Sequence, residues 1–166
     1  MQPGAPMSLV DARLAPHGRV HPSPTTWRDQ VLYFLLPDRF SDGQEQAHPR
    51  FDRADGAHFL APDQPAWREA GRRFVGGTLR GIRSKLPYLR DLGVTALWIG
   101  PIWRQRADMQ TYHGYAIQHF LDVDPRFGTR HDLRALVDAA HQQGIYVVGR
   151  FKDVASVGAG GAGGAA

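Results

Sequence analysis

The residues with the most obvious chemical use lie in two short segments. Tyr112, His113 and Tyr115 combine two phenol rings with an imidazole, and Asp38 and Arg39 place a carboxylate beside a guanidinium. Aromatic rings with a few polar groups commonly line binding pockets, but the same rings can simply pack a loop against the body of a protein. The choice between these interpretations depends on the elements that position the two segments.

Composition excludes several kinds of site. The 166 residues include no cysteine, so a disulfide framework, a thiolate zinc site and a cysteine nucleophile are ruled out. The formal net charge is +4, but the basic residues are scattered and no basic run is interleaved with stacking aromatics, so we expect no nucleic-acid partner. No apolar run approaches the roughly 18 residues of a membrane span, so we expect no membrane partner.

The chain divides into three regions. Residues 1–26 are rich in proline and small residues and predict an extended leader. No secretory signal is visible in them, which favours a cytoplasmic location without establishing one. Residues 27–148 predict the globular part. Residues 149–166 predict an aberrant low-complexity tail, because their glycine- and alanine-rich run has nothing to pack.

The globular part alternates strand and helix signals. Short apolar runs with β-branched and aromatic members predict buried strands, and leucines at helical spacing predict helices. The expected order is a strand at 30–36, helical turns at 79–89 divided near Pro87, a strand at 94–99, a helix between Thr129 and Gly144, and a strand at 145–148. The polar residues 44–75 predict a long surface loop. The short links from helix to strand imply a parallel sheet with right-handed crossovers.

Two parallel folds share this pattern, an open doubly wound sheet and the beginning of a (β/α)8 barrel. A dinucleotide-binding sheet has a Gly-x-Gly-x-x-Gly turn directly after its first strand, whereas here Gly76 and Gly77 come only after a long loop. Long loops after strands build the sites of barrels at their C-terminal face. The sequence therefore predicts an α/β fold with about three strands, the N-terminal β/α units of an incomplete TIM (β/α)8 barrel.

Five segments in order resemble glycoside hydrolase family 13, the α-amylase family. They are Trp27–Phe40, Gly76–Ile82, Leu92–Ile99, Thr111–Tyr115 with Asp122–Thr129, and Ala140–Val148. They are similar to the family's first strand and loop, its first helix, its second strand, the loop after that strand, and the approach to the third strand. The resemblance implies the truncated N-terminal part of a catalytic domain that, at full length, hydrolyses α-1,4-linked glucans.

The resemblance also implies roles for the two chemical segments. Tyr115 corresponds to the aromatic residue that stacks on the sugar ring at the bond-cleaving subsite, and His113 corresponds to a polar contact in the same pocket. The expected partner is therefore an α-glucan or oligosaccharide. The alternative, that these residues only pack a loop against the barrel rim, remains open. Asp38 and Arg39 are expected to fix the first loop, because a buried ion pair specifies geometry rather than performing catalysis.

Calcium is the one cofactor that the resemblance raises. Some relatives bind it in the first loop with a carboxylate where Asp42 stands, asparagines where this chain has Gln44, Ala47 and His48, and an aspartate where it has Thr78. Calcium takes about six to eight oxygen ligands, and one carboxylate does not supply them. We therefore expect no metal ligand and no cofactor in this chain.

The resemblance ends before the residues that carry out the reaction. The family uses a retaining mechanism in which two carboxyl groups lie about 5–5.5 Å apart, and its catalytic carboxylates follow later strands. After Val148 the chain has no Asn-His pair, and Asp153 does not match by spacing. We therefore assign no catalytic residue and expect the chain itself to be inactive.

Two alternatives stay open for the function. The retained segments are shared with cyclodextrin- or trehalose-forming transglycosylases and isomerases of the same family. The chain could also be a non-catalytic truncated product. Since three parallel strands leave two unpaired edges and an uncovered face, we expect the isolated chain to be prone to aggregation or only partly ordered.

Overall fold

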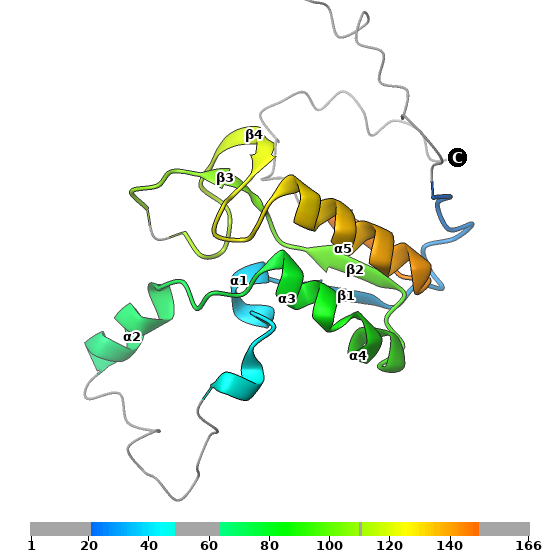
Figure 1. Cartoon of the computed structure of the whole chain (residues 1–166), viewed down its shortest axis with the longest axis horizontal. Coiled ribbons are helices and arrows are strands. Elements are labelled where there is room, and N and C mark those ends of the chain that lie inside the picture. The colour runs from blue at the N-terminus through cyan, green and yellow to red at the C-terminus, as the bar shows by residue number, and fades with distance from the viewer. Residues whose placement is uncertain (1–20, 49–63, 110, 150–166) are drawn as a thin grey trace, which may run out of the picture.

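The computed structural model describes residues 21–48, 64–109 and 111–149 (Figure 1). Most of the expected leader and tail therefore lies outside the described residues. In chain order the elements are β1 Leu32–Leu35, α1 Pro37–Phe40, η1 Glu45–Ala47, α2 Gln64–Arg72, α3 Leu79–Ser84, α4 Leu86–Asp91, β2 Ala96–Ile99, β3 Trp103–Gln105, β4 Ile117–Val123, α5 Arg130–Gln142 and β5 Tyr146–Gly149. Among these helices, none has the length and apolar character to cross a bilayer.

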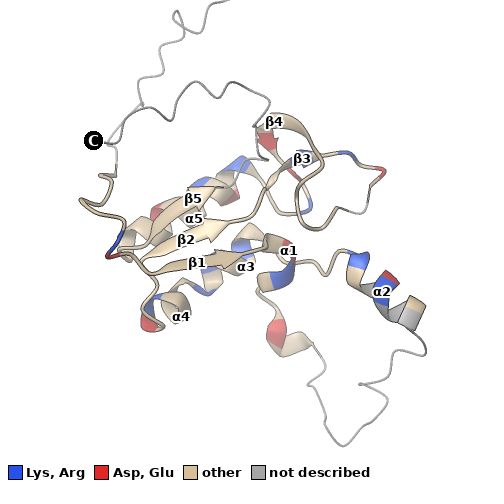
Figure 2. Cartoon of the chain, turned by 180° about the vertical axis from the view of Figure 1, so that it is seen from behind, with Lys and Arg blue, Asp and Glu red and all other residues tan. Residues whose placement is uncertain are grey.

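The main sheet has the order β1-β2-β5, and both of its strand pairs are parallel. The register aligns Leu35 with Ile99 and Ile99 with Gly149, so the three strands end at one edge. Helices α3, α4 and α5 lie on one face of this sheet, as the two opposite views show (Figures 1 and 2). This α/β arrangement confirms the predicted β/α units of an incomplete barrel.

The core lies between the sheet and these helices. Leu35, Leu97 and Ile99 come from the strands, and all three are buried. The helices contribute the fully buried side chains Leu79, Ile82, Leu86, Leu89, Leu136 and Ala140. The leucine spacing that predicted the helices therefore marks the face that packs on the sheet.

The boundaries of the helices follow from local signals. Thr129 and Asp132 form a capping box at the start of α5, in which each side chain accepts the other's backbone N–H. The Arg80 guanidinium lies 2.7 Å from the Asp132 carboxylate, and with the Thr129 hydroxyl it lowers the pKa of Asp132 to about 2. Lys85 separates α3 from α4, and Pro87 lies in the first turn of α4, where its missing N–H is tolerated.

Two elements differ from the sequence prediction. Residues 44–75 are not one long loop, because η1 and the helix α2 lie within them, with 49–63 outside the described residues. Pro65 is compatible with α2 because it is only the second residue of that helix. The segment between β2 and α5, for which the sequence predicts no element, contains the antiparallel pair β3–β4 with an irregular register.

The opposite face of the main sheet is apolar and open. Leu32 and Phe34 are 49% and 46% exposed, and Phe34 packs edge-on against Trp98 with ring centroids 5.4 Å apart. Figure 2 shows the strands from this side, with no described helix in front of them. Parallel sheets are normally covered on both faces, so this surface is poorly suited to water.

We predict that this face drives self-association of the isolated chain. Phe34→Ser should reduce the binding of the dye ANS and raise the fraction of monomer seen by sedimentation, because it removes an exposed ring from the patch. Tyr88→Ser is the matched control, since Tyr88 is an exposed aromatic on α4. A soluble monomer with a cooperative thermal transition would contradict the prediction.

Candidate functional site

The candidate site lies at the edge where the parallel strands end. The chain leaves β1 through α1 and leaves β2 through Gly100, whose N–H donates to the Leu35 carbonyl at 2.8 Å. The loops after β1 and β2 therefore begin side by side. In parallel α/β folds this carboxyl edge is where loops form binding sites.

Arg39 brings the two chemical segments together. Its guanidinium carbon lies 3.8 Å from the centroid of the Tyr112 ring. A guanidinium over an aromatic face is attracted by the ring's negative face. The loop after β1 and the loop after β2 are thus joined by a direct side-chain contact that no spacing in the sequence indicates.

Residues 111–115 form a tight turn. The Gly114 N–H donates to the Thr111 carbonyl at 2.9 Å, which places Tyr112 and His113 at the corner. Gly114 has φ +86°, and a Cβ on it would lie 2.1 Å from the Pro101 carbonyl oxygen. Only glycine allows the turn to lie this close to the backbone after β2.

The turn places His113 beside Tyr115. The Tyr115 N–H donates to His113 Nδ1 at 3.1 Å, and the two ring centroids are 5.5 Å apart. Because Nδ1 accepts this bond, the network assigns the proton of the neutral imidazole to Nε2, where it is a donor. Both side chains are half-buried, so the pair combines an aromatic face with a polar donor.

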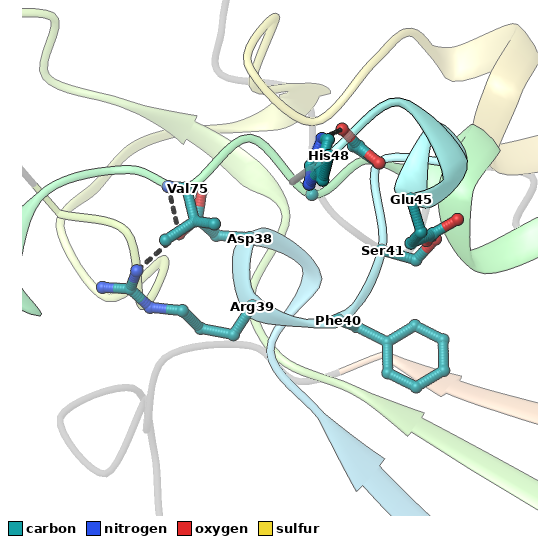
Figure 3. Close-up of a pocket in the computed structure, with 9 residues that line it drawn as sticks. Asp38, Arg39, Phe40, Ser41, Glu45, His48 and Val75 are labelled. Carbon is teal, nitrogen blue, oxygen red and sulfur yellow. Dashed lines mark hydrogen bonds and ion pairs between the residues drawn. The ribbon is translucent and has the colours of Figure 1, made fainter. Parts of the chain in front are cut away.

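Asp38 has the structural role expected of it. Its carboxylate is buried and accepts the Val75 N–H at 3.0 Å (Figure 3). It also accepts the Gly76 N–H at 3.0 Å. Arg39 Nη1 is 3.5 Å from the same carboxylate. Asp38 therefore fixes the loop after β1 to the residues that lead into α3.

The glycines of the Gly76–Ile82 segment allow that fixation. A Cβ on Gly77 would lie 2.1 Å from the Pro37 carbonyl oxygen, and one on Gly81 would lie 2.0 Å from the Ser41 carbonyl oxygen. The start of α3 thus packs directly on the backbone of the first loop. The repeated glycines were the sequence signal for this contact, but the partner backbone could not be identified from them.

A second buried carboxylate was missed in the sequence. Asp124 is almost fully buried and binds the Arg126 guanidinium with two contacts of 2.8 and 2.9 Å, while the Gln105 N–H donates to it at 3.0 Å. Burial acts to raise the pKa of Asp124, but these donors outweigh burial and hold the pKa below its usual range. The Arg126 guanidinium also lies 4.4 Å from the centroid of the Phe74 ring. Asp124 therefore fixes β3 relative to the start of α5.

The loop after β1 surrounds a small cavity of about 130 Å3 (Figure 3). It is lined by Asp38, Arg39, Phe40, Ser41, Asp42, Glu45, His48, Val75 and Gly77, so neither His113 nor Tyr115 contributes to it. Glu45 Oε2 binds Lys85 Nζ at 2.8 Å and Glu45 also accepts the Ser41 hydroxyl. Lys85 and Ser41 together lower the pKa of Glu45 to about 2.

The residues at the family's first-loop calcium position do not fit that ion. Asp42 accepts His48 Nε2 at 2.9 Å and the Gln44 N–H at 2.7 Å, and the Thr78 hydroxyl accepts the Gly81 N–H as the cap of α3. The donor set supplies one carboxylate against the six to eight oxygens that calcium prefers. Across the described ranges, no three His, Asp or Glu side chains gather into a group that could hold a metal.

Comparison with known proteins places this geometry in a family. Residues 34–151 match the α-amylase catalytic domain. The chain belongs to the α-amylase family. It is 38% identical over 137 residues to the periplasmic α-amylase of Escherichia coli (strain K12), covering 76% of this chain and 19% of that protein. The chain thus spans about a fifth of the length of this relative.

Solved structures agree with this family assignment. An α-amylase from Geobacillus thermoleovorans, complexed with acarbose, aligns with a TM-score of 0.56 and 33% identity, over 77% of this chain and 24% of that one. A cyclomaltodextrin glucanotransferase with a three-domain ABC distribution aligns with a TM-score of 0.54 and 31% identity, over 74% and 25%. The predicted family resemblance is confirmed, as a partial catalytic domain.

We predict that Gly114→Ala displaces the turn at 111–115. A β-carbon there meets the Pro101 carbonyl, so amide hydrogen exchange at position 114 and at Tyr115 should accelerate. Gly144→Ala is the matched control, because Gly144 also has positive φ, +75°, but a Cβ on it would have nothing within 4 Å. Each substitution should lower the free energy of unfolding by about 1 kcal/mol or more through backbone strain. Equal exchange rates at residues 111–115 in both variants would show that the close approach of Gly114 to the Pro101 carbonyl does not position the turn.

We also predict that the loop after β1 is insensitive to calcium. Amide exchange over residues 41–47 should be the same with calcium and with EDTA, because Lys85 and His48 already occupy the carboxylates. Lys85→Met should accelerate exchange there, while Arg83→Met, which removes an exposed cation from the last turn of α3, should not. Slower exchange of the unmodified chain on adding calcium would show that a site forms after all.

Proposed function

We propose that this chain supplies one rim of the substrate-binding site of an α-amylase-type hydrolase acting on α-1,4-linked glucans. The observation that carries the proposal is the pairing of His113 with Tyr115 on a tight turn at the carboxyl edge of the sheet. A glucose ring has an apolar face that suits the Tyr115 ring and hydroxyls that suit a donor at His113 Nε2.

The contacts of Tyr112 support different roles for the residues of the turn. Tyr112 packs on Arg39, so it acts in holding the turn. His113 and Tyr115 then have the role of contacting the sugar, which is the role implied by their position in the family motif. The contact with Arg39 gives Tyr112 a packing role, and we assign the sugar contact to His113 and Tyr115.

In the whole enzyme, we propose a retaining reaction. One carboxylate attacks the anomeric carbon while a second protonates the leaving oxygen and later activates water. No residue of this chain is assigned to either task, so the chain is proposed to bind glucan without cleaving it. Transfer to a sugar acceptor rather than water is the second candidate, because a glucanotransferase shares this part of the fold at a similar level of identity.

We predict that the chain binds maltoheptaose through Tyr115. Tyr115→Ala should weaken binding about fivefold to tenfold, because the stacking face is lost, while Tyr115→Phe should keep most of the affinity. Tyr88→Ala removes an exposed tyrosine from α4 and is the matched control. Isothermal titration would measure the affinities, with the β-1,4-linked cellohexaose as the negative ligand.

Three results would count against the proposal. Equal affinity of Tyr115→Ala and Tyr88→Ala would remove Tyr115 from the site. Equal binding of cellohexaose and maltoheptaose would remove the selectivity for α-glucans. Release of reducing sugar from starch by this polypeptide alone would contradict the proposed lack of catalysis.

A further inference from the structure

Arg39 lies where three separate segments meet. It belongs to α1, its Nη2 donates to the Gly71 carbonyl in α2 at 2.6 Å, and its guanidinium covers Tyr112 in the turn after β2. Its side chain is 27% exposed. The planar guanidinium can donate at its edge while its face covers a ring, which the point charge of a lysine cannot reproduce.

The ion pair with Asp38 does not explain this placement. Asp38 already accepts two backbone N–H groups, and its 3.5 Å separation from Arg39 is longer than a normal charged hydrogen bond. The carboxylate would therefore keep its main partners without Arg39. The closer contacts of the guanidinium are with Gly71 and Tyr112.

Tyr112, which Arg39 contacts, is linked to His113 and Tyr115 by further contacts within the turn. The Tyr112 ring meets His113 edge-on with centroids 5.4 Å apart, and His113 in turn packs on Tyr115 and accepts its N–H. At Gly114 the backbone of the turn lies close to the Pro101 carbonyl. Arg39 adds an attachment of the turn to the loop of a different strand.

We propose that Arg39 is a positioning residue for the sugar-contacting pair. By holding Tyr112 it sets where His113 and Tyr115 lie relative to the loop after β1, and it joins the two loops into one binding rim. The inference rests on the proposed function for the sugar contact, but the positioning itself is a property of the turn and can be measured without a ligand.

The test combines amide hydrogen exchange with binding of maltotetraose, using the full chain at low micromolar concentration. The variants are Arg39→Met, Arg39→Lys, Tyr112→Leu and the double variant, with Arg83→Met as the control. Arg39→Met should accelerate exchange over residues 111–115 about fivefold, the loss expected for one exposed cation–aromatic contact, and weaken maltotetraose binding by a similar factor. Arg39→Lys should lie between Arg39→Met and the unmodified chain.

The double variant separates positioning from a general loss of stability. If Arg39 acts through Tyr112, Arg39→Met with Tyr112→Leu should be no worse than either single change. Exchange over β2 should stay unchanged in every variant. The proposal is overturned if the turn is unaffected by Arg39→Met, if β2 loosens as much as the turn, or if the two changes add.

The two proposals fail in different ways. If the unmodified chain does not bind maltotetraose but Arg39→Met still loosens the turn through Tyr112, the glucan-binding function fails and the positioning role stands. If the unmodified chain binds maltotetraose and Arg39→Met leaves both exchange and affinity unchanged, the positioning role fails and the function stands.

Discussion

The buried carboxylate of Asp38 is the constraint on which the rest of the site depends. It accepts the N–H groups of Val75 and Gly76 and so ties the end of β1 to the start of α3. A buried carboxylate without such donors would be strongly unfavourable, so the two segments must stay together. The side-chain-free positions Gly77 and Gly81 make this possible, because any β-carbon there would meet the first loop's backbone.

With α3 fixed in this way, hydrogen bonds and ion pairs link it to the segment before α5 and link that segment to β3. The Leu79 N–H donates to the Phe127 carbonyl, which links α3 to the segment before α5. Asp124, paired with Arg126, accepts the Gln105 N–H and so holds that segment to β3, and Arg39 reaches from α1 to Tyr112. The turn with His113 and Tyr115 is therefore organised by contacts within the described part of the chain.

The main sheet shows the opposite situation. Its helix-covered face has a packed core, whereas Phe34 and Trp98 lie on a face that the described helices do not cover. The sheet therefore has the edge at which the site forms, but one of its two apolar faces is not covered by the described helices, although parallel sheets are normally covered on both faces. The contacts that organise the rim of the site are therefore distinct from the burial that stabilises the sheet.

The order of β1, α3, α4, β2, α5 and β5, the division of the first helical stretch near Pro87, the end of α5 before Gly144 and its cap at Thr129 were determined by the sequence alone. These features depend on apolar periodicity and on backbone preferences within a few residues. The helix α2 and the β3–β4 pair were missed because α2 is short and has Pro65 as its second residue, and because β3 has only three residues. Only the tertiary structure decided that Arg39 lies on Tyr112 and that Asp124 is buried with Arg126. Arg39 and Tyr112 lie far apart in the chain, so their contact depends on how the two loops fold together. Whether Asp124 and Arg126 are buried as a pair depends on the groups that surround them, which the local sequence does not specify.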